Sequence, residues 1–288
     1  MSVVVVTDSA SSLPQEDLER LHIKVASLYV NEGSTSQRET EIALPAFYER
    51  LQDVSSLPTT SQPSPQDFSD VFTEAVEAGH DVCCVLLSSK MSSTYATAEI
   101  EVKLMREQYP DARIELVDSE SNSMQEGFAV LAAAECAAEG GSLAECAAAA
   151  RATIPRTRFL FAPYSLEYLS RGGRISGATA LLGSALQIAP ILTALDGTTG
   201  IAGKVRTYSK ALLRMAKMMR TDVARCGLKR AAVQAISDIE GGRRFAHELI
   251  EPIVGSSVPV VPIAATIGLH VGPAIGVTYE TIDPLREG

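Results

Sequence analysis

The fold class follows from residues 82–94, which read Val-Cys-Cys-Val-Leu-Leu-Ser-Ser-Lys-Met-Ser-Ser-Thr. The first six residues form an uninterrupted apolar run, as expected of a parallel strand that is buried on both faces. The hydroxyl-rich residues that follow predict a turn, and a helix is expected from there to about Gln108. The stretch therefore predicts a strand, a polar turn and a helix in succession.

The same order of elements recurs twice in the first half of the chain. Stretches typical of strands lie at 3–6 and 114–117, polar turns at 7–12 and 118–123, and helical stretches at 14–21 and 124–139. Repeated units of this kind predict a parallel sheet covered by helices. In open α/β sheets, ligands bind outside the carboxyl ends of the strands, and the hydroxyl clusters fall there.

The loop at residues 57–65 contains three prolines, so we expect an extended loop rather than a strand or helix, with Ser64 as the N-cap of the next helix. After Ala150 the pattern changes. Strands are expected at 159–161, 231–236, 258–263 and 276–279, helices at 178–188, 209–226 and 241–250, and a hairpin turn at Asp196-Gly197. We therefore predict a parallel-sheet N-terminal α/β domain over residues 1–160 and a second α/β domain over residues 161–288.

The charge of the chain is unevenly distributed. The net charge is −10, which argues against non-specific binding of nucleic acid. Residues 204–230 nevertheless carry nine Lys or Arg residues against one acid, Asp222. A local basic surface on an acidic protein suggests a specific anionic partner, and an ordinary solvated helix face is the alternative.

Several classes of protein are not indicated. The N-terminus lacks the pattern of a signal peptide, and no stretch approaches the ~20 apolar residues of a membrane span. The five cysteines form no C-x-x-C pair, so neither a zinc site nor a disulfide framework is expected. Motifs of nucleotide-binding loops, zinc proteases and hydrolase elbows are missing. We therefore expect a cytoplasmic protein without a metal or cofactor.

Three positions are candidates for binding an anion. Ser92 and its neighbours open a helix, where unpaired N–H groups and hydroxyls suit a carboxylate or phosphate, although plain N-capping is the alternative. His270 lies in an apolar, glycine-rich segment whose glycines permit close approach of a ligand, or it is a structural histidine. Arg174 follows two glycines and suits a carboxylate, or it is a surface arginine.

Six segments resemble, in chain order, the signatures of the DegV family. They are residues 5–9, 60–64, 88–95, 117–119, 169–175 and 267–273, and they extend over nearly the whole chain. The resemblance implies a bacterial protein that binds one long-chain fatty acid, such as palmitate, and presents its carboxyl group to a separate fatty acid kinase for acyl-phosphate formation. It also implies that this chain is itself no enzyme and contacts the membrane at most transiently.

The resemblance also implies roles for individual residues. The carboxylate ligands would be Thr60, Ser61, Ser92 and His270, with Arg174 nearby, and Arg206 would serve kinase docking or transfer. The small apolar residues of 177–188, with Ile191 and Leu192, would line a tunnel for the acyl tail, or they are ordinary core. About 15 buried methylenes at about 0.8 kcal/mol each would supply on the order of 10 kcal/mol before the costs of binding.

Two other functions remain open from the residues alone. Ser92 as nucleophile and His270 as base would make an acyl hydrolase, and the same turns would suit a small-anion binder. The aspartates at the other two strand ends, Asp8 and Asp118, are expected to be scaffolding, because a like charge repels a fatty-acid head group.

Overall fold

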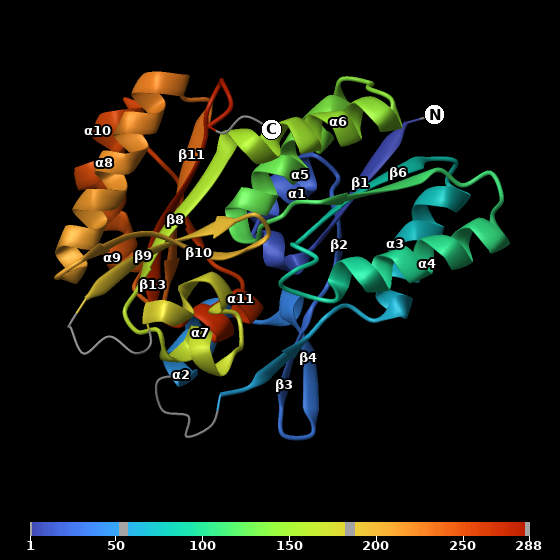
Figure 1. The fold of residues 1–288 in the computed structure, drawn as a ribbon. Coiled ribbons are helices and arrows are strands. Elements are labelled where there is room, and N and C mark those ends of the chain that lie inside the picture. The colour runs from blue at the N-terminus through green and yellow to red at the C-terminus, as the bar shows by residue number, and fades with distance from the viewer. Residues whose placement is uncertain (1, 52–56, 182–187, 286–288) are drawn as a thin grey trace. The chain divides into compact units, whose positions relative to one another are not determined.

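A computed structural model describes residues 2–51, 57–181 and 188–285. The chain forms two compact units (Figure 1). Unit 1 comprises residues 1–42 and 58–154, and unit 2 comprises residues 43–57 and 155–288. The sequence places a single boundary near residue 160, whereas the structure divides the chain between Ile154 and Pro155 and assigns residues 43–57 to the second unit.

Unit 1 is built on the predicted parallel sheet. Its strands are β1 (Val3–Asp8), β2 (Lys24–Ala26), β6 (Asp81–Leu86) and β7 (Ile114–Asp118), in the order β2-β1-β6-β7. Every neighbouring pair is parallel. β6 lies inside the sheet and is buried along its whole length, as its unbroken apolar run predicts.

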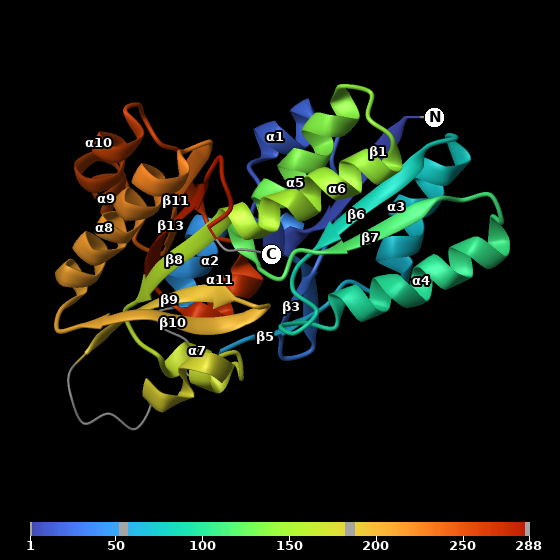
Figure 2. The ribbon, with the colours of Figure 1, turned by 45° about the horizontal axis from the view of Figure 1, so that its top comes forward.

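Helices cover both faces of this sheet (Figures 1 and 2). They are η1 (Ser9–Ser11), α1 (Gln15–Arg20), η2 (Glu39–Glu41), α3 (Pro65–Glu77), α4 (Thr94–Gln108), α5 (Ser123–Ala138) and α6 (Leu143–Thr153). α3 and α4 pack against alternate residues of β6, namely Val82, Cys84 and Leu86. α5 and α6 cover the opposite face. The alternation of side chains along β6 therefore supplies two separate cores.

A small antiparallel sheet completes unit 1, and it corrects one expectation. β5 (Thr59–Ser61) pairs with β3 (Tyr29–Glu32), which also pairs with β4 (Thr35–Arg38), so residues 59–61 form a strand and not the expected loop. Prolines 58 and 63 lie outside the paired residues, so they remove no N–H group from the ladder. Ser64 caps α3 as expected, and it forms a capping box with Asp67.

Unit 2 contains a six-stranded sheet in the order β10-β9-β8-β13-β11-β12. The strands are β8 (Thr157–Pro163), β9 (Ala189–Leu195), β10 (Thr198–Val205), β11 (Arg230–Ile236), β12 (Val260–Pro262) and β13 (Ala274–Glu280). The pairings are antiparallel except that of β11 with β12. Asp196 and Gly197 both have positive φ, as the predicted two-residue hairpin turn requires.

The helices of unit 2 are α2 (Leu44–Leu51), η3 (Ile154–Arg156), α7 (Glu167–Arg171), η4 (Ser176–Leu181), α8 (Tyr208–Cys226), α9 (Ile239–Phe245), η5 (Ala246–Ile250), α10 (Glu251–Val254) and α11 (Ala265–Val271). Four of them, η4, α8, α9 and η5, overlap the predicted stretches, whereas α2, η3, α7, α10 and α11 were not predicted. η5 is a π-helical turn and η4 a 3₁₀ helix. The helix expected over 178–188 extends beyond η4 into residues 182–187. Four of the residues expected to line the tunnel therefore lie outside the described residues, namely Leu182, Gly183, Ala185 and Leu186.

The glycines around α11 serve packing within unit 2. A Cβ at Gly268 would lie 2.1 Å from the hydroxyl of Tyr48, and a Cβ at Gly272 would lie 2.3 Å from the ring of Tyr168. The Tyr48 hydroxyl reaches the carbonyl oxygens of Ile263 and Ala264 at 2.9 and 3.0 Å. The sequence predicts that these glycines admit a ligand, but in the structure they admit two tyrosines of the same unit.

Buried carboxyl groups lie around the carboxyl end of β1. Glu126 on α5 is fully buried and accepts a hydrogen bond from the Thr7 hydroxyl (3.3 Å), and Ser9 donates to Glu39. Burial, opposed by two backbone hydrogen bonds, raises the pKa of Asp8 to about 7. Burial and the charge of Asp8 raise the pKa of Glu126 well above its ordinary value. The folded unit therefore retains protons that the unfolded chain loses.

Gly272→Ala should destabilise unit 2 strongly. Gly272 has a φ of +71°, and its new methyl group would also displace the Tyr168 ring, so we expect a cost of about 2–4 kcal/mol. Gly255→Ala controls for the positive φ alone, because Gly255 has a φ of +81° with nothing within 4 Å of a new Cβ; its ψ of +7° is easier for alanine than the ψ of −172° at Gly272. Urea denaturation measures both variants. Equal losses would show that the contact with Tyr168 contributes nothing.

Glu126→Gln should flatten the pH dependence of stability. The free energy of unfolding of the natural chain falls as pH rises from about 4 through the raised pKa values of Asp8, near 7, and of Glu126. The glutamine stays neutral, so the fall should become shallower by up to about 1.4 kcal/mol per pH unit. Denaturation between pH 5 and 9 tests this, with Glu139→Gln, an exposed position at the end of the same helix, as the control. An unchanged slope would contradict the prediction.

Candidate functional site

The turn between β6 and α4 is held by the two aspartates that end the neighbouring strands. Asp8 accepts a hydrogen bond from the Leu87 N–H at 2.9 Å, and both carboxylate oxygens of Asp118 lie 3.3 Å from the Ser89 nitrogen. Asp8 and Asp118 therefore hold the turn from the strands on either side of β6. This confirms the expectation that they are scaffolding. The turn leads directly to Ser92.

Ser92 is half-buried at the start of α4. Its hydroxyl accepts a hydrogen bond from the Thr94 N–H at 3.3 Å and lies 2.9 Å from the Thr94 hydroxyl. Ser93, at the N-cap position, makes no capping bond through its side chain and is exposed. The capping role expected as the alternative therefore belongs to Ser92. The helix terminus adds a partial positive charge, which favours an anion.

Thr60 and Ser61 point to opposite faces of β5. Thr60 lies opposite Val30 in the ladder and Ser61 lies opposite Tyr29, and successive side chains of a strand alternate between faces. The Ser61 hydroxyl accepts a hydrogen bond from the Asn31 amide at 3.2 Å. The resemblance implies that both hydroxyls bind the same carboxylate, whereas the strand places them on opposite faces. Thr60 shares its face with the buried Val30.

In unit 2, His270 lies in the last turn of α11 and packs against the end of α7. A Cβ at Gly172 would lie 2.3 Å from the imidazole Nδ1, so only glycine leaves room for the ring. Burial and the positive charge of Arg174 lower the pKa of His270 to about 4. The imidazole is therefore neutral near pH 7 and acts as a hydrogen-bonding group, not as a cation.

Arg174 and Arg206 are both exposed. The Arg174 guanidinium donates to the carbonyl oxygen of Gly172 at 2.6 Å. Gly172 also lies against the imidazole of His270, so Arg174 and His270 both contact the same glycine. Arg206 lies between β10 and α8, next to Thr207, whose hydroxyl caps α8. The predicted residues thus fall into two sets, with Thr60, Ser61 and Ser92 in unit 1 and His270, Arg174 and Arg206 in unit 2.

The outward side of α8 carries the basic residues noted in the sequence. Lys210, Arg214, Lys217 and Arg220 are exposed, and none forms an ion pair with a residue that the structure describes. The single acid of the stretch, Asp222, is buried and accepts hydrogen bonds from Arg158 (2.6 Å) and Tyr279 (2.5 Å). The described residues of unit 2 therefore do not neutralise the positive charge of α8.

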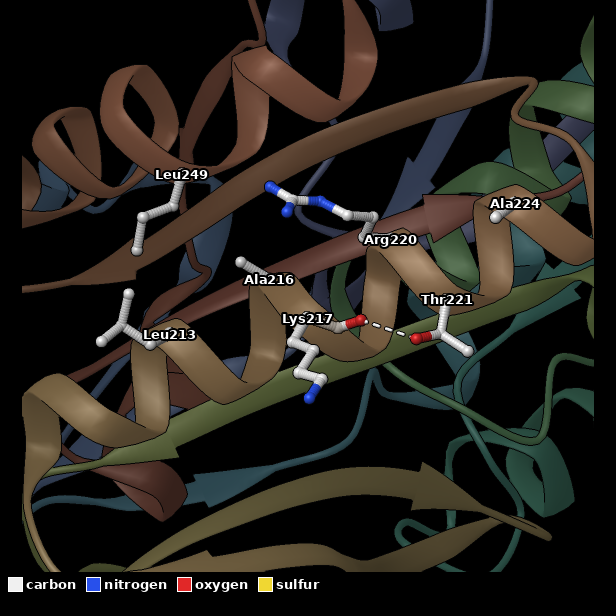
Figure 3. Close-up of a pocket in the computed structure, with 7 residues that line it drawn as sticks. All are labelled: Leu213, Ala216, Lys217, Arg220, Thr221, Ala224 and Leu249. Atoms are coloured by element: carbon white, nitrogen blue, oxygen red, sulfur yellow. Dashed lines mark hydrogen bonds between the residues drawn. The ribbon is translucent and has the colours of Figure 1, made fainter.

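A groove of about 550 Å³ lies beside these cations, between α8 and η5 (Figure 3). Leu213 and Leu249 point toward each other across it, Ala216 lines it further along α8, and Arg220 extends over the same gap. The Leu213 side chain is 55% exposed. We call this the α8 groove; it is lined by Leu213, Ala216, Lys217, Arg220, Thr221, Ala224 and Leu249.

Sequence reasoning missed Asn31, Tyr29 and Asp67, which surround β5. Asp67 had a detectable signal, since Ser64 and an acid three residues later form a capping-box pattern. Asn31 and Tyr29 had none, because their role depends on the register between β3 and β5.

Metal and membrane sites find no support in the part of the chain that the structure describes. That part contains no group of three or more His, Cys, Asp or Glu residues able to hold a metal ion. None of the helices seen there is long and apolar enough to span a bilayer.

Comparison with known proteins gives matches along the whole chain. The family model described as "Uncharacterised protein, DegV family" matches residues 2–281. A DegV domain-containing protein of Clostridium acetobutylicum is 40% identical over 292 residues, which cover 99% of this chain and 100% of that protein. A second one, of Clostridium perfringens, is 37% identical and covers 97% of this chain and 99% of its own length.

Solved structures agree with this result. DegV of Bacillus subtilis, described as a fatty acid binding protein, has a TM-score of 0.87 and 30% identity, covering 98% of this chain and 99% of its own. A DegV family protein of Thermus thermophilus, described by its fatty acid binding, has a TM-score of 0.84 and 32% identity, covering 98% and 100%. The two-unit α/β fold is that of these proteins, and the chain belongs to the DegV family.

Proposed function

We propose that this chain binds one long-chain fatty acid. The observation that carries the proposal is the likeness over 98% of the chain to two proteins described as binding fatty acids, at 30% and 32% identity. In this proposal the carboxylate is bound by Thr60, Ser61, Ser92 and His270, with Arg174 nearby. Ser61 contributes through its backbone, because its hydroxyl lies on the face of Asn31.

The chemistry of these groups fits an ionised carboxylate. A carboxylate only accepts hydrogen bonds, and hydroxyls and a neutral imidazole each have a proton to donate. Hydrogen bonds to a charged group are stronger than neutral ones. The apolar tail supplies the larger part of the affinity, on the order of 10 kcal/mol for about 15 methylenes.

The pKa of His270 disfavours the hydrolase. A general base works best when its pKa lies near the operating pH, and burial with the charge of Arg174 lowers the pKa of His270 to about 4. Such an imidazole accepts a proton from a serine hydroxyl poorly at neutral pH. Binding of an acid, which needs no proton transfer, makes better use of the same group.

We further infer that the chain passes its fatty acid to a separate kinase in the cytoplasm, and does not itself transfer a phosphoryl group. Arg206 and the cations of α8 would dock an acidic surface of that kinase. Their exposure and the unneutralised charge of α8 support this role. The five free cysteines are compatible with a reducing compartment.

Protein purified from a bacterial host should carry a fatty acid that mass spectrometry detects after extraction. Replacing Thr60 by Val or Ser92 by Ala should weaken palmitate binding by the delipidated protein about tenfold or more, because each removes a hydrogen bond to a charged group. Titration calorimetry measures the affinity. Ser93→Ala is the control, since Ser93 is exposed and makes no capping bond. No extractable lipid and no rebinding would refute the proposed function.

Reversing Arg206 and Arg214 to Glu should reduce acyl-phosphate formation by a bacterial fatty acid kinase about tenfold or more, because like charges would then face each other. Palmitate affinity should stay unchanged. The control reverses two other exposed cations, Lys103 and Arg243, with the same change in net charge. Loss of palmitate binding in the Arg206/Arg214 variant would show that these residues are structural.

A further inference from the structure

We propose that Asp67 is a positioning residue for the fatty-acid carboxylate, and that it acts by fixing β5. The inference rests on the proposed function, in which Thr60 on β5 binds the carboxylate. Asp67 lies on α3 and is not among the proposed ligands. Its role follows from how β5 is attached to the rest of unit 1.

β5 has little support of its own. It has three residues, and it pairs with β3 on one side only. Prolines 58 and 63 flank it, and neither can donate a backbone hydrogen bond. A strand this short at the edge of a sheet is held in place largely by contacts outside its own ladder. One group of such contacts lies at the end of β5 that leads into α3.

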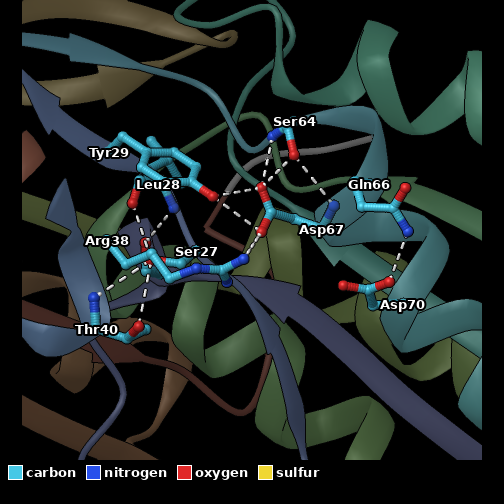
Figure 4. Close-up of polar contacts among 10 residues, drawn as sticks. Ser27, Leu28, Tyr29, Arg38, Thr40, Ser64, Gln66, Asp67 and Asp70 are labelled. Carbon is cyan, nitrogen blue, oxygen red and sulfur yellow. Dashed lines mark hydrogen bonds and ion pairs between the residues drawn. The ribbon is translucent and has the colours of Figure 1, made fainter. Parts of the chain in front are cut away.

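The Asp67 carboxylate connects three elements at that end (Figure 4). It accepts hydrogen bonds from the Ser64 N–H at 2.8 Å and the Ser64 hydroxyl at 2.6 Å, at the start of α3. The Tyr29 hydroxyl of β3 lies 3.0 and 2.9 Å from its two oxygens. Arg38, at the end of β4, forms an ion pair with it. Since the Asp67 side chain is only 1% exposed, these contacts are shielded from water.

The protonation state of Asp67 agrees with this role. Burial would raise the pKa of its carboxyl group, but the hydrogen bonds from Ser64 and Tyr29 and the charge of Arg38 outweigh burial and hold the pKa below its ordinary value. Asp67 is therefore a carboxylate at neutral pH. Every group that contacts it is a donor, so its charge is required for the arrangement.

Tyr29 transmits this support to β5. Its backbone lies opposite Ser61 in the ladder while its hydroxyl contacts Asp67. Asn31 lies two residues along β3, on the same face as Tyr29, and donates to the Ser61 hydroxyl at 3.2 Å. The Ser61 face of β5 is thus used for attachment. The opposite face carries Thr60, which the proposed function assigns to the carboxylate.

The test compares two ligands in Asp67→Asn. Palmitate needs an aligned set of donors for its charge, whereas hexadecanol has the same chain and no charge. We expect the affinity for palmitate to fall about tenfold and the affinity for hexadecanol to change less than twofold, both measured below the thermal midpoint of the variant, which should lie below that of the natural chain because a buried ion pair is lost. Asp70→Asn is the matched control, because Asp70 lies one turn along α3 and contacts only the exposed Gln66. It should leave both affinities unchanged.

Tyr29→Phe is a second variant that tests the same inference if Asp67→Asn does not fold. It removes one hydroxyl from Asp67 and leaves the ion pair with Arg38, so we expect a selective loss for palmitate of about threefold. Equal losses for both ligands, or unchanged palmitate affinity in folded Asp67→Asn, would overturn the inference while leaving the proposed function intact. A natural chain that binds no palmitate would overturn both.

Discussion

The turn between β6 and α4 depends on two carboxylates that accept its N–H groups. Asp8 and Asp118 end the strands on either side of β6, so the turn is fastened to the parallel sheet itself. This arrangement places negative charge beside a turn that, in the proposed function, approaches an anion. The raised pKa of Asp8, about 7, reduces that conflict, because a protonated carboxyl group repels a carboxylate far less.

The sequence patterns predicted those features of the fold that are determined by interactions between neighbouring residues of the chain. The apolar run of β6, the capping of α3 by Ser64 and the hairpin turn at Asp196-Gly197 each depend on residues next to one another in the chain. The scaffolding role of Asp8 and Asp118 was predicted from their charge and their position at strand ends, because a like charge repels a fatty-acid head group. A strand end places its last side chain beside the adjacent turn in every parallel sheet, so the type of residue there carries the information.

Features that depend on distant partners were not predictable. Residues 43–57 join unit 2 because Tyr48 fits against Gly268, and nothing in the sequence near Tyr48 indicates that partner. The glycines of α11 were interpreted as space for a ligand, since sequence alone does not show which side chain fills the space. The opposite orientation of Thr60 and Ser61 follows from the pairing of β5 with β3. This pairing was not predicted, because the flanking prolines indicated a loop at these residues.

The candidate ligands of the head group are uncharged, and this suits a protein that hands its ligand on. Hydroxyls and a neutral His270 bind a carboxylate through hydrogen bonds, while the cation of that set, Arg174, is exposed and already donates to Gly172. A buried ion pair would hold the carboxylate more firmly, but it would also withdraw the electron density with which a carboxylate oxygen attacks a phosphoryl group. Affinity that resides mainly in the apolar tail avoids this penalty. In the proposed function, the carboxylate therefore stays oriented and reactive while the tail keeps the ligand bound.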